Sequence, residues 1–315
     1  MSASAFRIGV IGAARRRQGT GPFLARFLHA AGARVVAICG TTTATANQAA
    51  ADLRTTCRMI LTPYSGARAM IAKERLDALA IASPAATHLA YLDLALDSGC
   101  HALSEKPLVW GGADPAGDAA RLVTGFSAKG LLLAVATQWR HGLGAYMQLF
   151  PDVVPRSATS FEMTLSPTST GRDMVPDALP HAFSILDHLF PAHDRPLSDL
   201  KIDASSRDAT TVSFTHPGGA AGIACVVRLA TVPSAPRPFG FGFDGRFATR
   251  VVTEPGYRIS LRDAATGREV PLSDPLDALV KAFVASVRRG PPFPVDPVIA
   301  TGVRRLVEVA SAWPP

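Results

Sequence analysis

A lysine that comes just after a short predicted strand is the side chain in this sequence best placed to do chemistry. Residues 104–107 read Ser-Glu-Lys-Pro and follow the strand expected at His101–Ser104. A buried strand at Ala78–Ala82 and a helix at Thr87–Asp97 come before it. Because ligands of open parallel sheets bind outside the carboxyl ends of the strands, Lys106 is predicted to point at a bound ligand.

Glycines between the first predicted strand and the first predicted helix indicate a phosphate-binding turn. Gly12 closes the strand, and Gly19 and Gly21 open the helix. Such a turn lets the backbone approach a pyrophosphate at the helix N-terminus. The loop is about four residues longer than the common G-x-G-x-x-G pattern, with Arg15–Gln18 as the insertion. In its place at the first strand-to-helix turn, it predicts dinucleotide binding.

The end of the second predicted strand bears on which dinucleotide is bound. NAD enzymes usually place Asp or Glu there to hold the ribose 2′-hydroxyl, whereas this chain has Gly40 followed by Thr41–Thr43. Without that carboxylate a 2′-phosphate meets no repulsion, and the guanidinium groups of Arg15–Arg17 suit its oxygens. NADP(H) is therefore favoured, and NAD(H) stays possible. The alternative is that the arginines form a solvated surface cluster and Gly40 only makes a turn.

The elements that must position these residues alternate between strand and helix in the first part of the chain. Apolar spacing predicts strands at Phe6–Ile11, Arg34–Cys39, Met59–Leu61, Ala78–Ala82, His101–Ser104 and Leu131–Thr137, and helices at Pro22–Ala31, Ala44–Leu53, Tyr64–Lys73, Thr87–Asp97 and Asp114–Lys129. Alternation of this kind implies right-handed crossovers and a doubly wound parallel sheet covered on both faces.

After about residue 140 the pattern changes to strands with polar alternation. They are expected at Ala158–Thr164, Thr210–Thr215, Ile223–Ala230, Phe247–Val252 and Arg258–Arg262, and they favour an antiparallel or mixed sheet. Two helices, Pro275–Arg289 and Pro297–Ala312, close the chain. Pro233–Gly242 is interpreted as a loop.

Composition narrows the class of protein. The chain has 315 residues, is 48% hydrophobic and 18% charged, and has no apolar run near the roughly 20 residues that span a bilayer. The net charge of +7 is spread thinly and no nucleic-acid motif is present, so a nucleic-acid partner is not expected. No export signal is visible and the four cysteines lack a C-x-x-C pair, which predicts a cytoplasmic protein with free thiols and no metal site.

Together these features resemble the Gfo/Idh/MocA family, the oxidoreductases named for glucose–fructose oxidoreductase and inositol 2-dehydrogenase. The resemblance covers essentially the whole chain and depends on the motifs at 7–12, 83–88, 105–107 and 177–181, together with the ending from Phe283 to Gly290. It implies an α/β fold with an N-terminal Rossmann domain at 1–125 and a C-terminal α/β domain at 126–315. The second domain would hold a large open, mostly antiparallel sheet, through which a homodimer or homotetramer would form.

The resemblance also implies roles for individual residues. Lys106 would hold the oxygen of a small, sugar-like substrate near the nicotinamide, and His181 would act as the acid or base. The positions expected to bind the cofactor, from the glycine turn, the end of the second predicted strand and the resemblance taken together, are Gly9, Gly12, Ala13, Arg15, Arg16, Arg17, Gly19, Thr20, Gly21, Gly40, Thr41, Thr42, Ser83, Pro84, His88, Glu105 and Lys106. Those implied to bind substrate are Gln138, Trp139, Arg140, Asp177 and Ser184.

Some of these positions have a second interpretation. His88 either caps or packs a helix or contacts a ligand, and Trp139 either stacks on a ligand ring or packs between elements. The family pattern Asp-x-Gly-x-His-x-x-Asp is altered at Leu179 and Ser184, and Asp187 is expected to be structural. Two other functions therefore stay open, a reductase of a C=N bond and a dinucleotide-binding protein without turnover.

Overall fold

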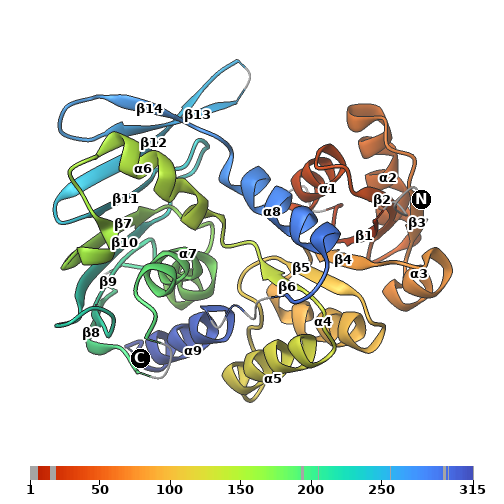
Figure 1. The fold of residues 1–315 in the computed structure, drawn as a ribbon, viewed down its shortest axis with the longest axis horizontal. Helices are drawn as coiled ribbons and strands as arrows, with labels where there is room; N and C mark the ends of the chain where they lie inside the picture. The colour runs from red at the N-terminus through yellow and green to blue at the C-terminus, as the bar shows by residue number, and fades with distance from the viewer. Residues whose placement is uncertain are drawn as a thin grey trace. The chain divides into compact units, whose positions relative to one another are not determined.

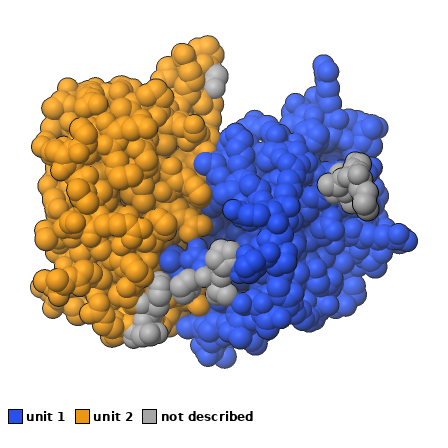
Figure 2. Space-filling model, viewed as in Figure 1, with its two compact units in different colours: residues 1–136, 276–299 blue, residues 137–275, 300–315 orange. Residues whose placement is uncertain are grey.

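The chain forms two compact units, coloured separately in Figure 2. In the computed structural model the described residues are 6–14, 19–192, 195–204, 206–255, 257–293, 296 and 298–314. Unit 1 comprises residues 1–136 and 276–299, and unit 2 comprises residues 137–275 and 300–315. The domain boundary expected after residue 125 falls within the helix Pro115–Ala128. The strand that follows this helix, Leu133–Val135, still belongs to the sheet of unit 1.

Unit 1 contains a parallel sheet with the strand order β3-β2-β1-β4-β5-β6. Its strands are β1 (Arg7–Ile11), β2 (Arg34–Cys39), β3 (Thr62–Tyr64), β4 (Ala78–Ile81), β5 (His101–Ser104) and β6 (Leu133–Val135). The order reverses between β1 and β4, and a crevice at such a switch point is where open α/β sheets bind ligands. The strand predicted at Met59–Leu61 begins three residues later, at Thr62, as the edge strand β3.

Helices pack on the two faces of this sheet. They are α1 (Gly21–Ala30), α2 (Thr43–Cys57), α3 (Ala67–Glu74), α4 (His88–Asp97), α5 (Pro115–Ala128) and α8 (Pro275–Arg289), and the short helix η1 (Ala85–Thr87) precedes α4. Ile8 and Val10 share a buried core with α1, α2 and α8. Gly9 points to the other face, where an added Cβ would lie 2.6 Å from Leu76 Cδ1 and 2.8 Å from Met70 Cε. A side chain at position 9 would therefore force the ends of Leu76 and of Met70, which lies on α3, to move.

Unit 2 contains an eight-stranded sheet in the order β14-β13-β12-β11-β7-β10-β9-β8 (Figure 1). The strands are β7 (Ser160–Leu165), β8 (Ser198–Asp203), β9 (Ala209–His216), β10 (Ile223–Ala230), β11 (Phe239–Phe243), β12 (Arg246–Thr253), β13 (Arg258–Asp263) and β14 (Glu269–Leu272). β7 and β10 run parallel, and the other pairs run antiparallel. The α/β class with one parallel and one mostly antiparallel sheet is confirmed.

Burial alternates along the strands of unit 2. In β7, β9 and β10 every second side chain is buried and the intervening ones are partly or fully exposed. Helix α7 (Met174–Leu189) packs against β10, and α6 (Leu143–Leu149) packs against β13 and β14. Three short helices, η2 (Gln138–Gly142), η3 (Pro155–Ser157) and η4 (Gly171–Asp173), and α9 (Val298–Ser311) complete the elements. One face of the sheet thus stays open, and self-association through it stays a prediction.

The stretch Pro233–Gly242 is not all loop, because the central strand β11 begins at Phe239. A search of the described helices finds none that is both long and apolar enough to cross a membrane.

Candidate active site

The carboxyl ends of the strands in unit 1 form one row. Ile11 is in register with Cys39 on one side and with Ile81 on the other, and Ser104 is in register with Ile81 and Val135. The residues that follow these positions therefore share one edge of the sheet. This edge brings together four segments that the sequence singled out, those beginning at 12, 40, 83 and 105.

The turn between β1 and α1 is built on glycines. Gly12 has a φ of +88°, and a Cβ on it would lie 2.6 Å from the carbonyl oxygen of Ala82. A Cβ on Gly21 would lie 2.6 Å from Cα of Ala13. Both glycines are thus required by close backbone packing, the first against the end of β4 and the second between α1 and its own turn.

A hydrogen bond joins this turn to the segment that carries Lys106. Thr20 Oγ1 donates to Glu105 Oε1 at 2.6 Å, and the amide nitrogen of Lys106 lies 3.3 Å from Glu105 Oε2. The amide nitrogen of Glu105 in turn donates to Ile81 O at 2.7 Å. Glu105 thus fixes the backbone of Lys106 between β4 and the glycine turn, and the peptide bond from Lys106 to Pro107 is cis.

His88 holds the same segment from the side of η1. Its side chain is buried, with Nδ1 2.8 Å from Pro107 O and Nε2 2.9 Å from Ser83 O. Carbonyl oxygens only accept hydrogen bonds, so the ring donates to one of them, and to both when it carries two protons. The packing interpretation of His88 agrees with this geometry, since both ring nitrogens face backbone carbonyls.

The end of β2 is a tight turn into α2. A Cβ on Gly40 would lie 2.5 Å from Thr45 Oγ1 and 2.7 Å from Ala46 N. Thr42 and Thr45 form a capping box, in which Thr45 N donates to Thr42 Oγ1 at 3.1 Å and Thr42 N donates to Thr45 Oγ1 at 3.0 Å. These close contacts therefore require a glycine at position 40, and this glycine brings no charge to the end of β2.

The remaining predicted cofactor residues lie along the same edge or outside the described part. Ala13 and Ser83 are buried, and the Ser83 hydroxyl accepts from Thr87 Oγ1 at 2.7 Å. Thr41 and Pro84 are exposed, and Gly19 is half-buried. Arg15, Arg16 and Arg17 lie outside the described residues.

The edge fits an anionic dinucleotide. Helix α1 begins beside the glycine turn. Its N-cap residue Thr20 makes no side-chain cap, and the hydroxyl donates to Glu105 instead. Its first turn, all of which the structure describes, carries no acidic side chain. Free N–H groups at a helix N-terminus suit a pyrophosphate.

In unit 2 the predicted acid or base lies on a helix that is buried almost all round. His181 is 8% exposed and Ser184 is 3% exposed, both on α7. Ser184 Oγ donates to the carbonyl oxygen of His181 at 2.9 Å, so its hydroxyl proton is used within the helix. Asp177, on the same helix, accepts at Oδ2 from Thr168 N, Thr168 Oγ1 and Ser169 N at 2.9, 3.1 and 3.1 Å. One oxygen of this predicted substrate residue therefore anchors the loop that follows β7.

Helix η2 packs against α7 and carries three predicted substrate residues, Gln138, Trp139 and Arg140. Trp139 is buried and stacks on Phe239 with the ring centroids 3.5 Å apart, so it packs within unit 2. His141, which follows Arg140 in the same short helix, was not singled out in the sequence. Burial lowers its pKa to about 4, and the nearby charges of Arg140 and His188 act in the same direction.

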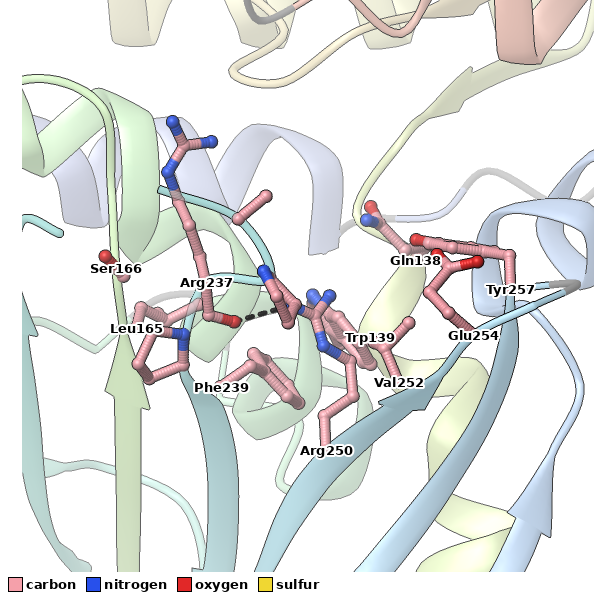
Figure 3. A pocket seen from close by; sticks show the side chains of 13 residues that line it. Gln138, Trp139, Leu165, Ser166, Arg237, Phe239, Arg250, Val252, Glu254 and Tyr257 are labelled. Carbon is pink, nitrogen blue, oxygen red and sulfur yellow. Dashed lines mark hydrogen bonds between the residues drawn. The ribbon is translucent and has the colours of Figure 1, made fainter. Parts of the chain in front are cut away.

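Unit 2 also holds a cavity of about 560 Å³ (Figure 3). Gln138 and Trp139 line it together with residues that the sequence did not indicate, among them Ser166, Arg237, Arg250 and Tyr257. These come from the end of β7, the segment before β11, the strand β12 and the turn after it, so no local motif could have grouped them.

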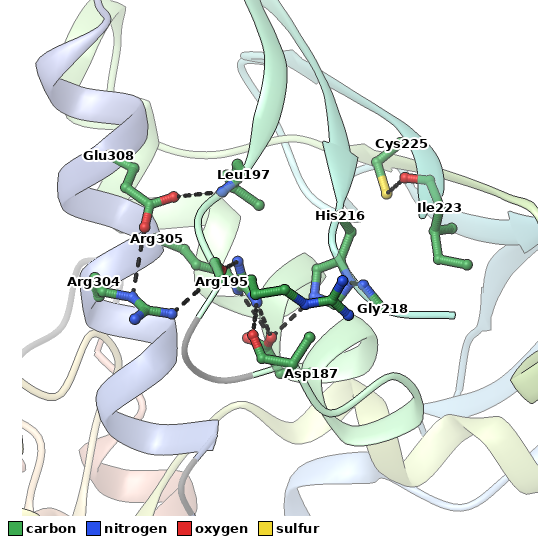
Figure 4. Close-up of polar contacts among 11 residues, drawn as sticks. Asp187, Arg195, Leu197, His216, Gly218, Ile223, Cys225, Arg304, Arg305 and Glu308 are labelled. Atoms are coloured by element: carbon green, nitrogen blue, oxygen red, sulfur yellow. Dashed lines mark hydrogen bonds and ion pairs between the residues drawn. The ribbon is translucent and has the colours of Figure 1, made fainter. Parts of the chain in front are cut away.

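A buried ionic network joins α7 to β9 and α9 (Figure 4). Asp187 Oδ1 accepts from His216 Nε2 at 3.0 Å and from Arg305 Nε at 2.9 Å, and all three side chains are fully buried. The N–H of Gly218 donates to His216 Nδ1, so the proton of this ring is on Nε2. Asp187 is structural, as expected from the sequence.

Comparison with known proteins finds a family match for the larger part of unit 1. Residues 6–137 match the Gfo/Idh/MocA profile, described as the oxidoreductase family with an NAD-binding Rossmann fold. This match confirms the predicted resemblance and the prediction of an NAD(P)-dependent oxidoreductase. No curated protein sequence matches the chain.

Solved structures share the fold over nearly the whole length. UDP-N-acetylglucosamine 3-dehydrogenase GnnA from Acidithiobacillus ferrooxidans is 20% identical with a TM-score of 0.70, and 98% of each chain is covered. KijD10, a 3-ketoreductase from Actinomadura kijaniata in complex with NADP, is 19% identical with the same TM-score and coverage. A Gfo/Idh/MocA family oxidoreductase from Vibrio cholerae is 14% identical with a TM-score of 0.67, covering 97% of this chain and 96% of its own.

Proposed function

Because residues 6–137 match the model of the Gfo/Idh/MocA oxidoreductase family, we propose that this chain is an NADP-dependent oxidoreductase acting on a carbonyl or alcohol group of a sugar-like substrate. The observation that supports it best is the link between the glycine turn and Lys106. Through the hydrogen bond from Thr20 to Glu105, the segment that would meet the pyrophosphate also fixes the backbone of Lys106.

The chemistry divides between the cofactor and two side chains. A bound nicotinamide exchanges a hydride with the substrate carbon. Lys106 is proposed to donate a hydrogen bond to the substrate oxygen and to stabilise the negative charge that develops there. His181 is proposed to deliver a proton to that oxygen during reduction, and to accept it during oxidation.

The absence of an acidic side chain at Gly40 supports the choice of NADP(H). A carboxylate at the end of β2 would repel a 2′-phosphate, and here the capping-box threonines Thr42 and Thr45 stand in its place. A solved structure with the same fold, KijD10, contains NADP.

A sugar substrate is supported by the relatives in the same fold. GnnA is a dehydrogenase of UDP-N-acetylglucosamine at carbon 3, and KijD10 is a 3-ketoreductase. The half-buried Gln138 and the hydroxyl of Tyr257 offer hydrogen bonds to substrate hydroxyl groups within unit 2.

Calorimetric titration with NADPH and NADH, followed by a substrate screen at the NADPH absorbance, tests the proposal. We expect NADPH to bind at least tenfold more tightly than NADH, and turnover with a keto sugar or the corresponding alcohol. Turnover of imines alone would support the C=N reductase instead. Tight NADPH binding without any turnover would support the non-catalytic dinucleotide-binding protein.

A further inference from the structure

The cavity in unit 2 carries an excess of positive charge. Of the described residues that line it, the charged ones are Arg237, Arg250 and Glu254. Neither arginine forms an ion pair with a carboxylate among the described residues, and Nε of Arg237 is buried there without a hydrogen-bond partner. Both side chains are partly buried, and a partly desolvated cation is stabilised by an anion bound beside it.

Arg250 is held in place by its surroundings. Its guanidinium lies 5.6 Å from the ring centre of Trp139 and 5.9 Å from that of Phe239, which stack on each other. One of its nitrogens, NH2, donates to the carbonyl oxygen of Arg237 at 2.6 Å. This leaves the other guanidinium N–H groups available at the cavity, in a rigid orientation that suits an oxyanion.

The desolvation of Arg250 points in the same direction. Burial lowers the pKa of this guanidinium, while Tyr257 and Asp274 raise it. A group whose charged form is penalised by burial gains most from a bound anion, because the anion restores the interactions that water no longer supplies.

The cavity is divided into two chemically different parts. In the view of Figure 3, Gln138, Glu254 and Tyr257 lie on one side, Arg237 and Ser166 lie on the other, and the Arg250 guanidinium lies between them. The first side offers hydrogen-bond groups of the kind that bind sugar hydroxyls. The second side and the centre offer two guanidinium groups.

We propose that this cavity binds the phosphate-bearing part of the substrate, with Arg250 at the centre and Arg237 at one side contacting its anionic oxygens, so that the substrate is a phosphorylated sugar. Two guanidinium groups match a phosphate, which carries about −1.5 to −2 charges at pH 7, better than a carboxylate with a single charge. The volume of about 560 Å³ is sufficient for a ligand larger than a phosphate ion. This inference rests on the proposed function, because it takes the phosphorylated compound to be the substrate of that reaction.

The phosphate can come from a sugar phosphate or from a nucleoside diphosphate, and direct titration distinguishes them. Glucose 1-phosphate, UDP and glucuronate are titrated into the protein saturated with NADPH, which occupies the dinucleotide site of unit 1. We expect binding of glucose 1-phosphate or UDP, and the tighter of the two identifies the source of the phosphate.

Variants show whether the binding occurs in this cavity. Arg250→Met and Arg237→Gln should each weaken the binding of the phosphorylated probe at least tenfold. Arg246→Gln is the matched control, because Arg246 also belongs to β12 but is half exposed and paired with Asp152 at 2.6 Å. The control should bind as the wild type does. Arg237→Gln keeps the test decisive if Arg250→Met does not fold.

Three outcomes would overturn the inference: no binding of either phosphorylated probe, equal binding by the wild type and both variants, or preferential binding of glucuronate. None of them depends on turnover. Failure of NADPH to bind would overturn the proposed function, and the response of probe binding to the two variants would still decide the inference about this cavity.

Discussion

Nδ1 of His88 lies 2.8 Å from the carbonyl oxygen of Pro107, the residue directly after Lys106. The other ring nitrogen lies 2.9 Å from Ser83 O. His88 thus connects the end of β4 to the segment that carries the proposed catalytic lysine. We therefore propose that His88 is a positioning residue, because both of its ring nitrogens lie within hydrogen-bond distance of backbone carbonyl oxygens.

Replacement of His88 should therefore affect turnover more than cofactor binding. We expect His88→Leu to lower kcat by about 10- to 100-fold, because a small displacement of a catalytic group carries a large kinetic cost. NADPH affinity, measured by calorimetry, should change less than kcat does. His88→Gln, whose amide can still donate to one carbonyl, should recover part of the loss. Equal kcat values for the wild type and His88→Leu would remove His88 from this role.

Lys106 itself should affect the chemical step. Lys106→Met keeps the length of the side chain and removes the ammonium, so we expect turnover to fall by 100-fold or more while NADPH still binds. Steady-state kinetics with the substrate from the screen measures this, with Lys73→Met, on the exposed side of α3, as the control. A loss of only two- or threefold would exclude Lys106 from the mechanism.

The proposed selectivity for NADPH can be tested at Gly40 only with a steric control. Any Cβ there would lie 2.5 Å from Thr45 Oγ1 and 2.7 Å from Ala46 N, so Gly40→Ala should already weaken binding of both cofactors. Gly40→Asp adds a negative charge to the same steric effect. We expect it to weaken NADPH further than Gly40→Ala does and to leave NADH close to the alanine value. The same NADPH affinity in both variants would argue against a 2′-phosphate at this position.

Local patterns predicted unit 1 better than unit 2. Alternating apolar strands and helices indicated the parallel sheet, and the position of Lys106 after β5 followed from it. The strand β3 was misplaced because Pro63 breaks the local strand signal, yet an edge strand tolerates proline. The contacts of His88 could not be predicted, since Ser83 O and Pro107 O come together only through the register of β4 with β5.

In unit 2 tertiary context outweighed local sequence. The prolines before Phe239 indicated a loop, but the segment Phe-Gly-Phe-Gly-Phe forms the buried strand β11. A Cβ on Gly240 would lie 2.6 Å from the ring of Phe247, so Gly240 makes room for a side chain of β12. The cavity beside this strand combines residues from four segments of the chain, which no spacing rule connects.

The ionic network behind α7 should be important for stability. Asp187→Asn leaves the fully buried Arg305 without its anion, and we expect the free energy of unfolding to fall by about 3–5 kcal/mol. Urea denaturation measures this. Asp152→Asn breaks an exposed pair with Arg246 and should cost less than about 1 kcal/mol.

The double variant Asp187→Asn with Arg305→Met tests whether the cost comes from the unpaired charge. Removal of both charges should be less destabilising than the sum of the two single changes, since no buried ion is left uncompensated. Strict additivity would show that the two side chains contribute by packing alone.

His141 should make stability depend on pH. Burial lowers its pKa in the folded protein to about 4, below the value of about 6.5 that the unfolded chain has. Between these values the unfolded chain binds more protons, so the stabilisation is present above about pH 6.5 and is lost as the pH falls toward 4. We expect this residue to account for a loss of roughly 1–3 kcal/mol across that window.

His141→Gln should lose less stability than the wild type between pH 7 and pH 4, measured by urea denaturation at each pH. His29→Gln, at an exposed position of α1, should follow the wild-type curve. Parallel curves for the wild type and His141→Gln would show that His141 is not held neutral by burial.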